Sequence, residues 1–236
     1  MRVALLGYGK MGRAIEAVLK ERGHEVALTV TQSNPLMNEA LNGIDVAIEF
    51  SRPDQAASHI RTCLMAGCPI VVGTTGWYHE WEAIRSMCGE RGGALFHATN
   101  FSIGVNMIFH INKQLAKMMA GFPAYSPSIT EIHHTAKLDA PSGTAITLAE
   151  GIIENHPQTK SWSLEANPGG DILAIDAQRI GEVPGTHIIR YHSDVDDIEI
   201  HHAAHHRGGF AQGAVSAAEF LIGKQGIYSM QDLLGF

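Results

Sequence analysis

Cysteines, long apolar runs and clusters of basic residues are scarce or missing in this sequence of 236 residues. Its 3 cysteines have no C-x-x-C spacing, so neither a disulfide framework nor a zinc knuckle is indicated, and a reducing, cytoplasmic location is expected. No run approaches the roughly 18 apolar residues of a membrane-spanning helix, so we expect no membrane partner. The formal net charge is −7 and lysine and arginine are dispersed, so we expect no nucleic-acid partner. An anionic ligand would therefore have to be bound by a local pocket.

The first hundred residues alternate short apolar runs with amphipathic segments, which is typical of β-α-β units around a parallel sheet. The predicted strands are Val3–Leu6, Val26–Val30, Val46–Phe50, Ile70–Val72 and Ala94–His97. The predicted helices are Lys10–Arg22, Pro53–Met65 and Trp77–Cys88. This pattern favours an α/β class with a Rossmann-like, doubly wound parallel sheet.

The pattern changes after residue 100. Helices are predicted over Val105–Met119, Thr144–Glu154 and Ala214–Ile222, and strands over Ser128–His134, Ile172–Ile180, His187–His192 and Ile198–His206. Strands that follow one another in this way indicate a second, α+β domain with a mixed or antiparallel sheet. We expect a dinucleotide-binding domain over residues 1–100, to which residues 214–236 return, and a substrate-binding and oligomerisation domain over residues 101–213.

A glycine turn follows the first predicted strand and leads directly into a helix. It reads Gly7-Tyr8-Gly9-Lys10-Met11-Gly12, the G-x-G-x-x-G spacing of a dinucleotide-binding turn. Gly7 would permit the tight turn, Gly9 the approach of a pyrophosphate, and Gly12 close packing of the helix. The free N–H groups at the helix start would bind the phosphates, so we expect all six residues to contact the cofactor. The alternative is a β-α turn that binds no ligand.

The second predicted strand is not followed by an acidic residue. The sequence there is Val30-Thr31-Gln32-Ser33-Asn34, where NAD-specific proteins carry a carboxylate for the ribose hydroxyls. A carboxylate would repel a 2′-phosphate, whereas hydroxyl and amide groups accept either cofactor. We therefore favour NADPH, or the use of both NADPH and NADH, although no arginine follows this strand to support NADPH directly.

Two further loops follow predicted strands and would lie at the same edge of the sheet. Because ligands of open α/β sheets bind beyond the carboxyl ends of the strands, both loops are candidates for cofactor contacts. The candidate residues are Gly73, Thr74, Thr75, Ala98, Thr99, Asn100 and Phe101. Ordinary loop structure is the alternative for each of them.

Titratable side chains are most concentrated in the segment Glu131–Ala145, which leads from a strand through a loop into a helix. His133 and His134 would point to opposite sides of an extended backbone, so we expect one imidazole to transfer a proton near neutral pH and the other to help bind the substrate. Lys137 would supply positive charge beside a bound carboxylate. The start of the helix would offer unbonded N–H groups to a carboxylate. The expected substrate contacts there are Ser142, Gly143 and Thr144.

Histidines also occur in the run His201-His202-Ala203-Ala204-His205-His206. In a strand, residues four apart are separated by about 13 Å, which is too far for two imidazoles to share one ion. We therefore expect no metal site in this chain.

These residues together resemble the 4-hydroxy-tetrahydrodipicolinate reductase family, also called dihydrodipicolinate reductases. The segment Glu131–Ala145 is similar to that family's E-x-H-H-x-x-K-x-D-A-P-S-G-T-A motif. Similar segments elsewhere are Gly7–Gly12, Gly73–Gly76, Asn100–Asn106, Arg179–Gly181 and Gly185–His187. The sequence departs from the family in the acidic residue missing after Val30 and in a glycine turn one residue shorter than in some members.

The resemblance implies NAD(P)H-dependent reduction of a small cyclic dicarboxylate in diaminopimelate and lysine biosynthesis by a homotetramer. It implies that His133 is the proton donor and acceptor, that Lys137 is the second proton donor, and that His134, Gly143 and Thr144 contact the substrate. Two alternatives stay open. One is another two-domain NAD(P)-dependent amino-dicarboxylate dehydrogenase, and the other is an NADPH-binding sensor without catalysis.

Overall fold

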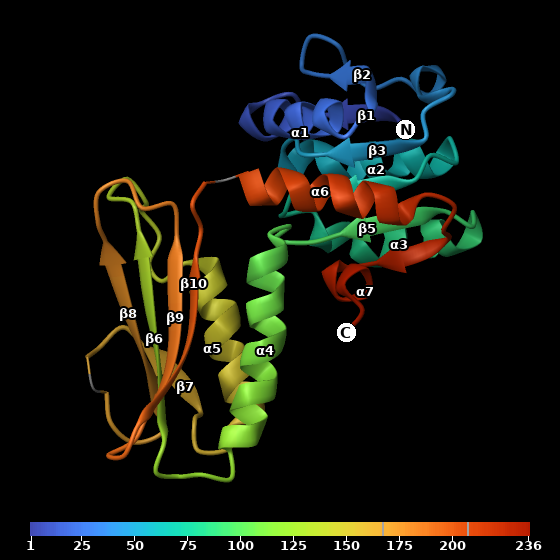
Figure 1. Cartoon of the computed structure of the whole chain (residues 1–236). Coiled ribbons are helices and arrows are strands. Elements are labelled where there is room, and N and C mark those ends of the chain that lie inside the picture. The colour runs from blue at the N-terminus through green and yellow to red at the C-terminus, as the bar shows by residue number, and fades with distance from the viewer. Residues whose placement is uncertain (167, 207) are drawn as a thin grey trace. The chain divides into compact units, whose positions relative to one another are not determined.

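The computed structural model describes residues 1–166, 168–206 and 208–236, and it divides into two compact units. Unit 1 comprises Met1–Ile103 with Gly208–Phe236, and unit 2 comprises Gly104–Arg207. Figure 1 shows a sheet with helices in each unit. Within the described ranges, no helix is both long and apolar enough to cross a membrane.

Unit 1 is built on a six-stranded sheet in the order β11-β5-β4-β3-β1-β2. Every pairing in this sheet is parallel. The strands are β1 (Arg2–Leu6), β2 (Glu25–Val30), β3 (Val46–Glu49), β4 (Ile70–Val72), β5 (Ala94–His97) and β11 (Gly226–Tyr228). The carboxyl ends of β1, β2 and β3 meet at one edge because Leu6 is in register with both Val30 and Glu49. The predicted parallel sheet is thus confirmed.

Helices cover both faces of this sheet. The helices are α1 (Lys10–Glu21), α2 (Pro53–Met65), α3 (Trp81–Glu90), α6 (Gly208–Leu221) and α7 (Met230–Leu234), with short 3-10 helices η1 (Asn38–Leu41) and η2 (Tyr78–Glu80). One core joins Val3 and Leu5 of β1 to α1 and α6, and the opposite core joins Ala4 and Leu6 to α2 and α3. Successive strand residues are therefore buried on opposite faces, which explains the continuous apolar runs of these strands. The predicted helix Trp77–Cys88 is instead η2 followed by α3.

Unit 2 contains a five-stranded sheet in the order β10-β9-β6-β8-β7. The strands are β6 (Ser126–His133), β7 (Ser161–Ser163), β8 (Ile172–Arg179), β9 (Thr186–His192) and β10 (Asp197–Ala203). β8 pairs parallel with β6 and β7, whereas β9 pairs antiparallel with β6 and β10. The sheet is therefore mixed, and β8 and β9 are separated by β6 although they are consecutive in the chain.

The helices α4 (Ile103–Met119) and α5 (Gly143–Asn155) lie on one face of this sheet (Figure 1). Alternate residues of the strands, such as Ile129, Leu173 and Ile189, are buried against them. Glu131 and His133 follow Ile129 on the same face because they lie two and four residues further along β6. The apolar core of unit 2 thus continues at the carboxyl end of β6 into a cluster of polar side chains.

Candidate active site

The glycine turn of unit 1 closes tightly on the backbone around it. Gly7 has a φ of 100°, and a Cβ built there would lie 2.2 Å from the backbone oxygen of Phe50. A Cβ at Gly12 would lie 2.3 Å from the backbone oxygen of Gly7. At Gly9, the N-terminal cap of α1, a Cβ would meet no atom within 4 Å, and no side chain caps the helix. The start of α1 is therefore open beside Gly9 and has no side-chain cap, as binding of a phosphate group at the first-turn N–H groups requires.

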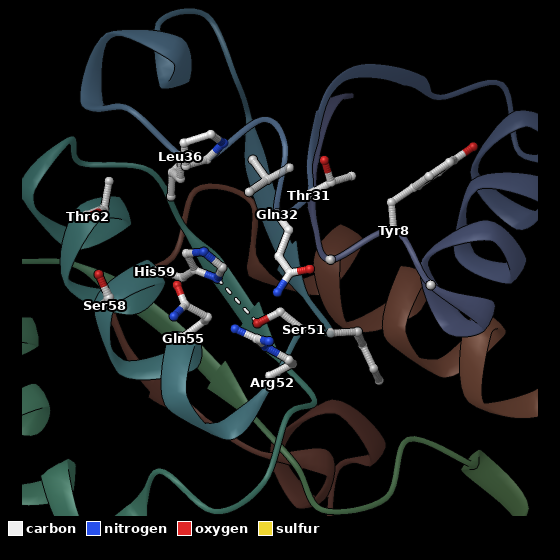
Figure 2. Close-up of a pocket in the computed structure, with 15 residues that line it drawn as sticks. Tyr8, Thr31, Gln32, Leu36, Ser51, Arg52, Gln55, Ser58, His59 and Thr62 are labelled. Atoms are coloured by element: carbon white, nitrogen blue, oxygen red, sulfur yellow. Dashed lines mark hydrogen bonds between the residues drawn. The ribbon is translucent and has the colours of Figure 1, made fainter.

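A cavity of about 740 Å³ opens at this turn (Figure 2). Its lining comes from the glycine turn, from the end of β2 and from α2. The lining residues are Gly7, Tyr8, Gly9, Val30, Thr31, Gln32, Pro35, Leu36, Phe50, Ser51, Arg52, Gln55, Ser58, His59 and Thr62. The Tyr8 hydroxyl donates to Glu16 on α1, and the Tyr8 ring points away from the α2 side of the cavity in Figure 2.

Arg52 is a cavity residue that the sequence interpretation missed. It is the N-terminal cap of α2, follows β3, and points into the cavity that Thr31 and Gln32 also line (Figure 2). Its guanidinium lies 3.0 Å from the exposed Asp54 carboxylate, and no carboxylate side chain lines the cavity in the described part of the chain. The order of the strands explains this position. β3 and β2 both flank β1, so the residues that follow these two strands reach the same edge of the sheet.

A buried carboxylate fixes the loop that carries Arg52. Glu49 at the end of β3 has no exposed surface, and its Oε1 accepts the Ser51 N–H at 3.1 Å and the Ser51 hydroxyl. The Nδ1 atom of His59 lies 3.4 Å from the same oxygen. The Ser51 N–H also reaches the hydroxyl of Thr74 at 2.9 Å. These contacts link β3 and α2 to one of the predicted cofactor loops.

That loop borders a second hollow of about 300 Å³. Its lining residues are Met11, Phe50, Ser51, Pro53, Gly73, Thr74 and Thr75. A Cβ at Gly73 would lie 2.2 Å from the Phe50 ring, so the close approach of this ring requires glycine. The structure therefore brings Gly73, Thr74 and Thr75 close to the glycine turn.

The other predicted cofactor loop does not line either hollow, and neither do Lys10 and Gly12 of the glycine turn. Phe101 is 2% exposed and packs against Phe50 and Phe96, with ring centroids 5.5 and 5.9 Å away. The side chain of Asn100 accepts the Ser102 N–H at 2.9 Å. Ala98 and Thr99 lie between β5 and Asn100. The predicted cofactor contacts of Ala98–Phe101 stay predictions.

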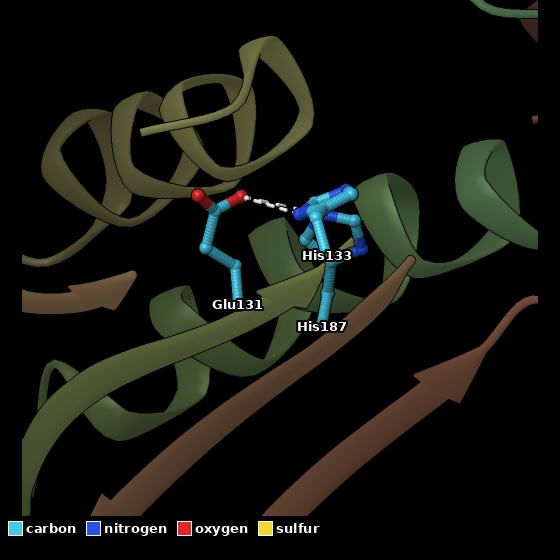
Figure 3. A group of neighbouring side chains, drawn as sticks. All are labelled: Glu131, His133 and His187. Atoms are coloured by element: carbon cyan, nitrogen blue, oxygen red, sulfur yellow. Dashed lines mark ion pairs between the residues drawn. The ribbon is translucent and has the colours of Figure 1, made fainter. Parts of the chain in front are cut away.

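The polar cluster of unit 2 is centred on Glu131, which has no exposed surface (Figure 3). Both of its carboxylate oxygens accept the Ser142 N–H, each at 3.1 Å. The Arg179 guanidinium donates to Oε1 at 3.1 Å, and the His133 Nδ1 atom lies 3.2 Å from Oε2. Burial of a carboxylate is costly unless it is paired and hydrogen-bonded, and these partners supply that compensation.

His187 of β9 packs against His133 at this cluster. The ring centroids are 5.2 Å apart with an interplanar angle of 71°, and the His187 Nε2 atom lies 3.3 Å from the Ser142 hydroxyl. Burial lowers the pKa of His187 to about 4, so this imidazole is neutral at pH 7. Burial is also the main cause that lowers the pKa of His133; Lys137 and Arg179 act in the same direction, and the Glu131 charge opposes them.

The loop that carries Lys137 is held by Arg179. The guanidinium donates to the backbone oxygens of Asp139 at 2.6 Å and of Lys137 at 3.4 Å. The Lys137 ammonium in turn donates to the Asp139 carboxylate at 2.6 Å, which holds the pKa of that carboxyl below its usual value. His134 directly follows β6, and the loop returns through the backbone bond from the Lys137 N–H to the His134 oxygen.

The predicted substrate contacts at the start of α5 divide into two kinds. Ser142 is 3% exposed, and its hydroxyl accepts the Ala145 N–H at 3.2 Å, so it caps the helix. Because its own N–H is bonded to Glu131, Ser142 positions the helix start from inside the protein. Gly143 is open, since a Cβ there would meet no atom within 4 Å, and Thr144 is half-buried. Gly143 and Thr144 are therefore the residues whose N–H groups a carboxylate can reach.

Three members of the cluster were not identified as site residues from the sequence: the buried Glu131 and His187 and the partly buried Arg179. The available signal was the i, i+2 spacing of Glu131 and His133, which places both on one face of a strand. In the described ranges, these two residues and His187 form the group whose potential metal-ligand atoms lie within 4.8 Å of one another. Arg179 already supplies positive charge to Glu131 there, as a bound cation would.

Comparison with known proteins connects the glycine turn of unit 1 and the polar cluster of unit 2 to one family. Residues 1–101 match the family model described as dihydrodipicolinate reductase, N-terminus, and residues 104–234 match the model of its C-terminus. A 4-hydroxy-tetrahydrodipicolinate reductase of Christiangramia forsetii is 47% identical over 99% of this chain and 98% of that protein. One from Neisseria meningitidis is 35% identical over 93% of this chain and 84% of its own length.

A solved structure shows the same fold. A dihydrodipicolinate reductase from Paenisporosarcina sp. TG-14, with dipicolinate bound, aligns with a TM-score of 0.81 at 23% identity and covers 98% of both chains. The family models cover nearly the whole chain, the identity to curated relatives is high, and the glycine turn and the His133 cluster fall one in each matched half. The chain therefore belongs to the dihydrodipicolinate reductase family.

Proposed function

We propose that His133, Lys137 and the start of α5 carry the substrate chemistry of this enzyme, and that the cavity at the glycine turn holds its cofactor. As a member of its family, the chain is an NAD(P)H-dependent oxidoreductase that reduces 4-hydroxy-tetrahydrodipicolinate to tetrahydrodipicolinate in diaminopimelate and lysine biosynthesis. The observation that carries the proposal is the single cluster in which His133 lies beside the Lys137 loop and the capped start of α5.

The cavity of unit 1 fits a nicotinamide dinucleotide. The open space at Gly9 and the uncapped start of α1 suit a pyrophosphate, and Gly73, Thr74 and Thr75 extend the surface along the sheet edge. When bound, NAD(P)H supplies the hydride of the reaction. The residues of the chain bind and orient the cofactor there, and the buried Glu49 network keeps the loop after β3 in place.

We propose that this cavity accepts NADPH, or both NADPH and NADH. No carboxylate side chain lines the cavity within the described ranges, and Arg52 offers a guanidinium beside the hydroxyl and amide groups of Thr31 and Gln32. The Arg52→Gln variant should bind NADPH about 10- to 100-fold more weakly, since a charge-assisted phosphate contact contributes about 1.5–3 kcal/mol, while NADH affinity stays within about twofold. The matched control is Arg85→Gln, an exposed arginine of α3 that does not line the cavity. Equal effects on both cofactors would refute the role of Arg52.

In unit 2, the proposed binding group for one substrate carboxylate is the pair of N–H groups at Gly143 and Thr144. These lie at the positive end of the α5 dipole, and Gly143 has no side chain to obstruct an approaching anion. His134 would contact the substrate from the end of β6, and Lys137 would supply a positive charge to a second carboxylate. An acidic chain thus binds a dianion at a local group of donors and cations.

The reduction consumes one hydride and one proton, and the 4-hydroxyl group leaves as water. We propose that His133 holds and transfers the proton and that Lys137 is the second donor. Because burial and the neighbouring cations lower the pKa of His133, the free imidazole is neutral at pH 7. A dianionic substrate nearby would favour the imidazolium and so help His133 to acquire the proton it donates.

The test is an assay of NADPH oxidation at 340 nm with substrate generated by the preceding aldolase. His133→Ala and Lys137→Ala should each lower kcat by about 10²-fold or more, the range of a positioned acid–base group, with cofactor affinity unchanged. His205→Ala, which removes an exposed histidine, and Lys113→Ala, at an exposed ion pair of α4, are controls that should keep full activity. Full activity of both site variants would contradict the assigned roles, and oxidation of an amino-dicarboxylate in place of this reaction would favour the alternative dehydrogenase.

We also propose that the enzyme is a cytoplasmic homotetramer. The 3 cysteines are buried and unpaired, which suits a reducing compartment. In unit 2, α4 and α5 cover one face of the sheet (Figure 1), and the other face carries partly exposed side chains such as Thr130, Ile132 and Ile188 that a second copy could cover. Light scattering after size-exclusion chromatography would give the mass, and a monomer at assay concentration would contradict the tetramer.

A further inference from the structure

We infer that Glu131 is a positioning residue that holds the proton of neutral His133 on Nδ1, which leaves Nε2 as the nitrogen that exchanges a proton with the substrate. We infer also that Gly185 provides the space that this orientation needs. The inference rests on the proposed catalytic role of His133. It concerns which ring nitrogen of His133 exchanges a proton with the substrate and which residue determines the tautomer.

The first observation is the position of the Glu131 carboxylate relative to the imidazole. Its Oε2 atom lies 3.2 Å from the Nδ1 atom of His133, and the carboxylate is fully buried. Nδ1 is buried and makes no hydrogen bond in the described part of the chain, so Glu131 acts on it through its charge. A carboxylate can only accept, so a lone pair on Nδ1 would be repelled and an N–H attracted. At low effective dielectric, this difference favours the Nδ1–H tautomer.

The second observation is that Glu131 itself cannot move to another partner. The Ser142 N–H and the Arg179 guanidinium hold its two oxygens at 3.1 Å, and the first of these bonds ties it to the cap of α5. The carboxylate therefore connects the carboxylate-binding helix start with the imidazole. A shift of Glu131 would disturb both.

The third observation concerns the opposite edge of the ring. A Cβ at Gly185 would lie 3.1 Å from the His133 Nε2 atom and 3.3 Å from Cδ2, closer than an ordinary contact. Gly185 precedes β9, whose His187 packs against the same imidazole in a T-shaped arrangement at a centroid distance of 5.2 Å. The His133 ring is thus confined by Glu131 at Nδ1, by the ring of His187 and by Gly185 beside Nε2.

The charged groups around His133 give the sign of the expected pH effect. Glu131 on β6 is the neighbour that raises the pKa of His133, whereas Lys137 and His134 of the loop and Arg179 of β8 lower it. His187 on β9 is neutral at neutral pH. If the imidazolium is the active donor, kcat falls as the pH rises through its pKa. Removal of the Glu131 charge lowers that pKa, so the falling limb of the profile moves to lower pH.

The first experiment compares kcat against pH for the wild type, Glu131→Gln, His133→Gln and the double variant. Glu131→Gln should lower kcat at pH 7.5 by about 10- to 100-fold, part of the 10²- to 10⁴-fold contribution of a positioned acid–base group, with its falling limb at lower pH. The double variant should match His133→Gln within about twofold, because Glu131 acts through His133. The control Glu154→Gln, an exposed carboxylate of α5, should leave the profile unchanged. Two results together would overturn the inference and indicate a merely structural role for Glu131. The pH profile of kcat for Glu131→Gln would be unshifted, and the loss of kcat in the double variant would equal the product of the losses in the two single variants.

The second experiment needs no substitution at Glu131. Spectra of the wild-type protein with ¹⁵N-labelled histidine identify the His133 tautomer, and the signals are assigned by their loss in His133→Gln. The expected result above the His133 pKa is Nδ1–H, and Nε2–H would overturn the inference even if the enzyme reduces its substrate. Gly185→Ala should lower kcat about 10-fold, because the added Cβ displaces the ring and because a φ of 156° is strained for any residue other than glycine. A wild type that reduces no substrate would refute the proposed function, whereas the tautomer would still be decided.

Discussion

The glycine turn allows cofactor binding to be separated from folding by two substitutions of the same size. Gly9→Ala adds a methyl group where no atom of the protein lies within 4 Å, in backbone with a φ of −84° that alanine adopts freely. Gly12→Ala adds the same group 2.3 Å from the backbone oxygen of Gly7, which belongs to the turn itself and cannot rotate away. An ordinary contact requires about 3.4 Å, so the turn would have to open by roughly 1 Å.

We therefore expect opposite patterns. Gly12→Ala should lower the free energy of unfolding by about 1–3 kcal/mol, the usual cost of overpacking, and should weaken cofactor binding as a consequence. Gly9→Ala should leave stability within about 1 kcal/mol, because the loss of a glycine cap is offset by a less flexible unfolded chain. It should raise the cofactor Kd about 10- to 100-fold, because the methyl group occupies the approach to the N–H groups of α1.

Urea unfolding and calorimetric titration with NADPH measure the two quantities separately. Equal destabilisation by both variants would show that the turn is purely structural. Unchanged cofactor affinity in Gly9→Ala would show that the phosphates lie elsewhere. Either result would refute the cofactor site at the start of α1.

Three further substitutions test the fold around the two sites. His187 has a pKa of about 4 when folded and 6.5 when unfolded, so its contribution of about 3 kcal/mol is present above pH 6.5 and lost as the pH falls to 4. His187→Gln should therefore lose less stability than the wild type between pH 7 and 4.5 in urea unfolding. Gly213→Ala would place a Cβ 1.7 Å from the backbone oxygen of Phe101 and should lower Tm more than Gly12→Ala does in calorimetry. Glu219→Gln removes the carboxylate that contacts Arg22 and His24, each at 2.8 Å and partly exposed, and should cost only about 0.5–1 kcal/mol.

Sequence patterns located the parallel sheet well because its strands are short apolar runs buried on both faces. The predictions for Ile70–Val72, Ala94–His97 and the helix Pro53–Met65 agree with the structure at both ends. Proline suits the first turn of a helix, and Pro53 therefore marks the first residue of α2 in the sequence. By contrast, β7 (Ser-Trp-Ser) and β11 (Gly-Ile-Tyr) are as short as β4 but lack its continuous run of β-branched residues, so they were not recognised.

The arrangement of unit 2 could be predicted only in part. The strands were located within a few residues, but the insertion of β6 between β8 and β9 depends on pairing between distant segments. The predicted strand Ile198–His206 ends at Ala203, so His205 and His206 lie beyond it. Alternation of polar and apolar residues does not reveal which strand will be a neighbour.

In the candidate sites too, residues that are close together in the sequence were predicted, whereas residues that reach the site from distant parts of the chain were not. The residues of each motif that lie close in sequence, such as Gly7–Gly12 and His133 with Lys137, were found from spacing and residue type. Arg52 was missed because it reaches the cavity from the end of β3, a strand on the other side of β1 from β2. Glu131 lies two residues before His133, yet its function depends on Arg179 and Ser142, which no local pattern connects to it.

Lys137 and Arg179 illustrate why charge alone could not assign these roles. Arg179 donates to Glu131 and to three backbone oxygens, so its guanidinium is fixed as part of the loop's framework. The Lys137 ammonium is paired with the carboxylate of Asp139, which is 65% exposed. The Lys137 side chain is only 19% exposed, but a pair whose carboxylate lies in solvent contributes about 0–1 kcal/mol, so a substrate carboxylate can displace Asp139 at little cost. Of these two cations, Lys137 is therefore the one that can change partner when a dianion binds, while Arg179 maintains the geometry of Glu131 and His133.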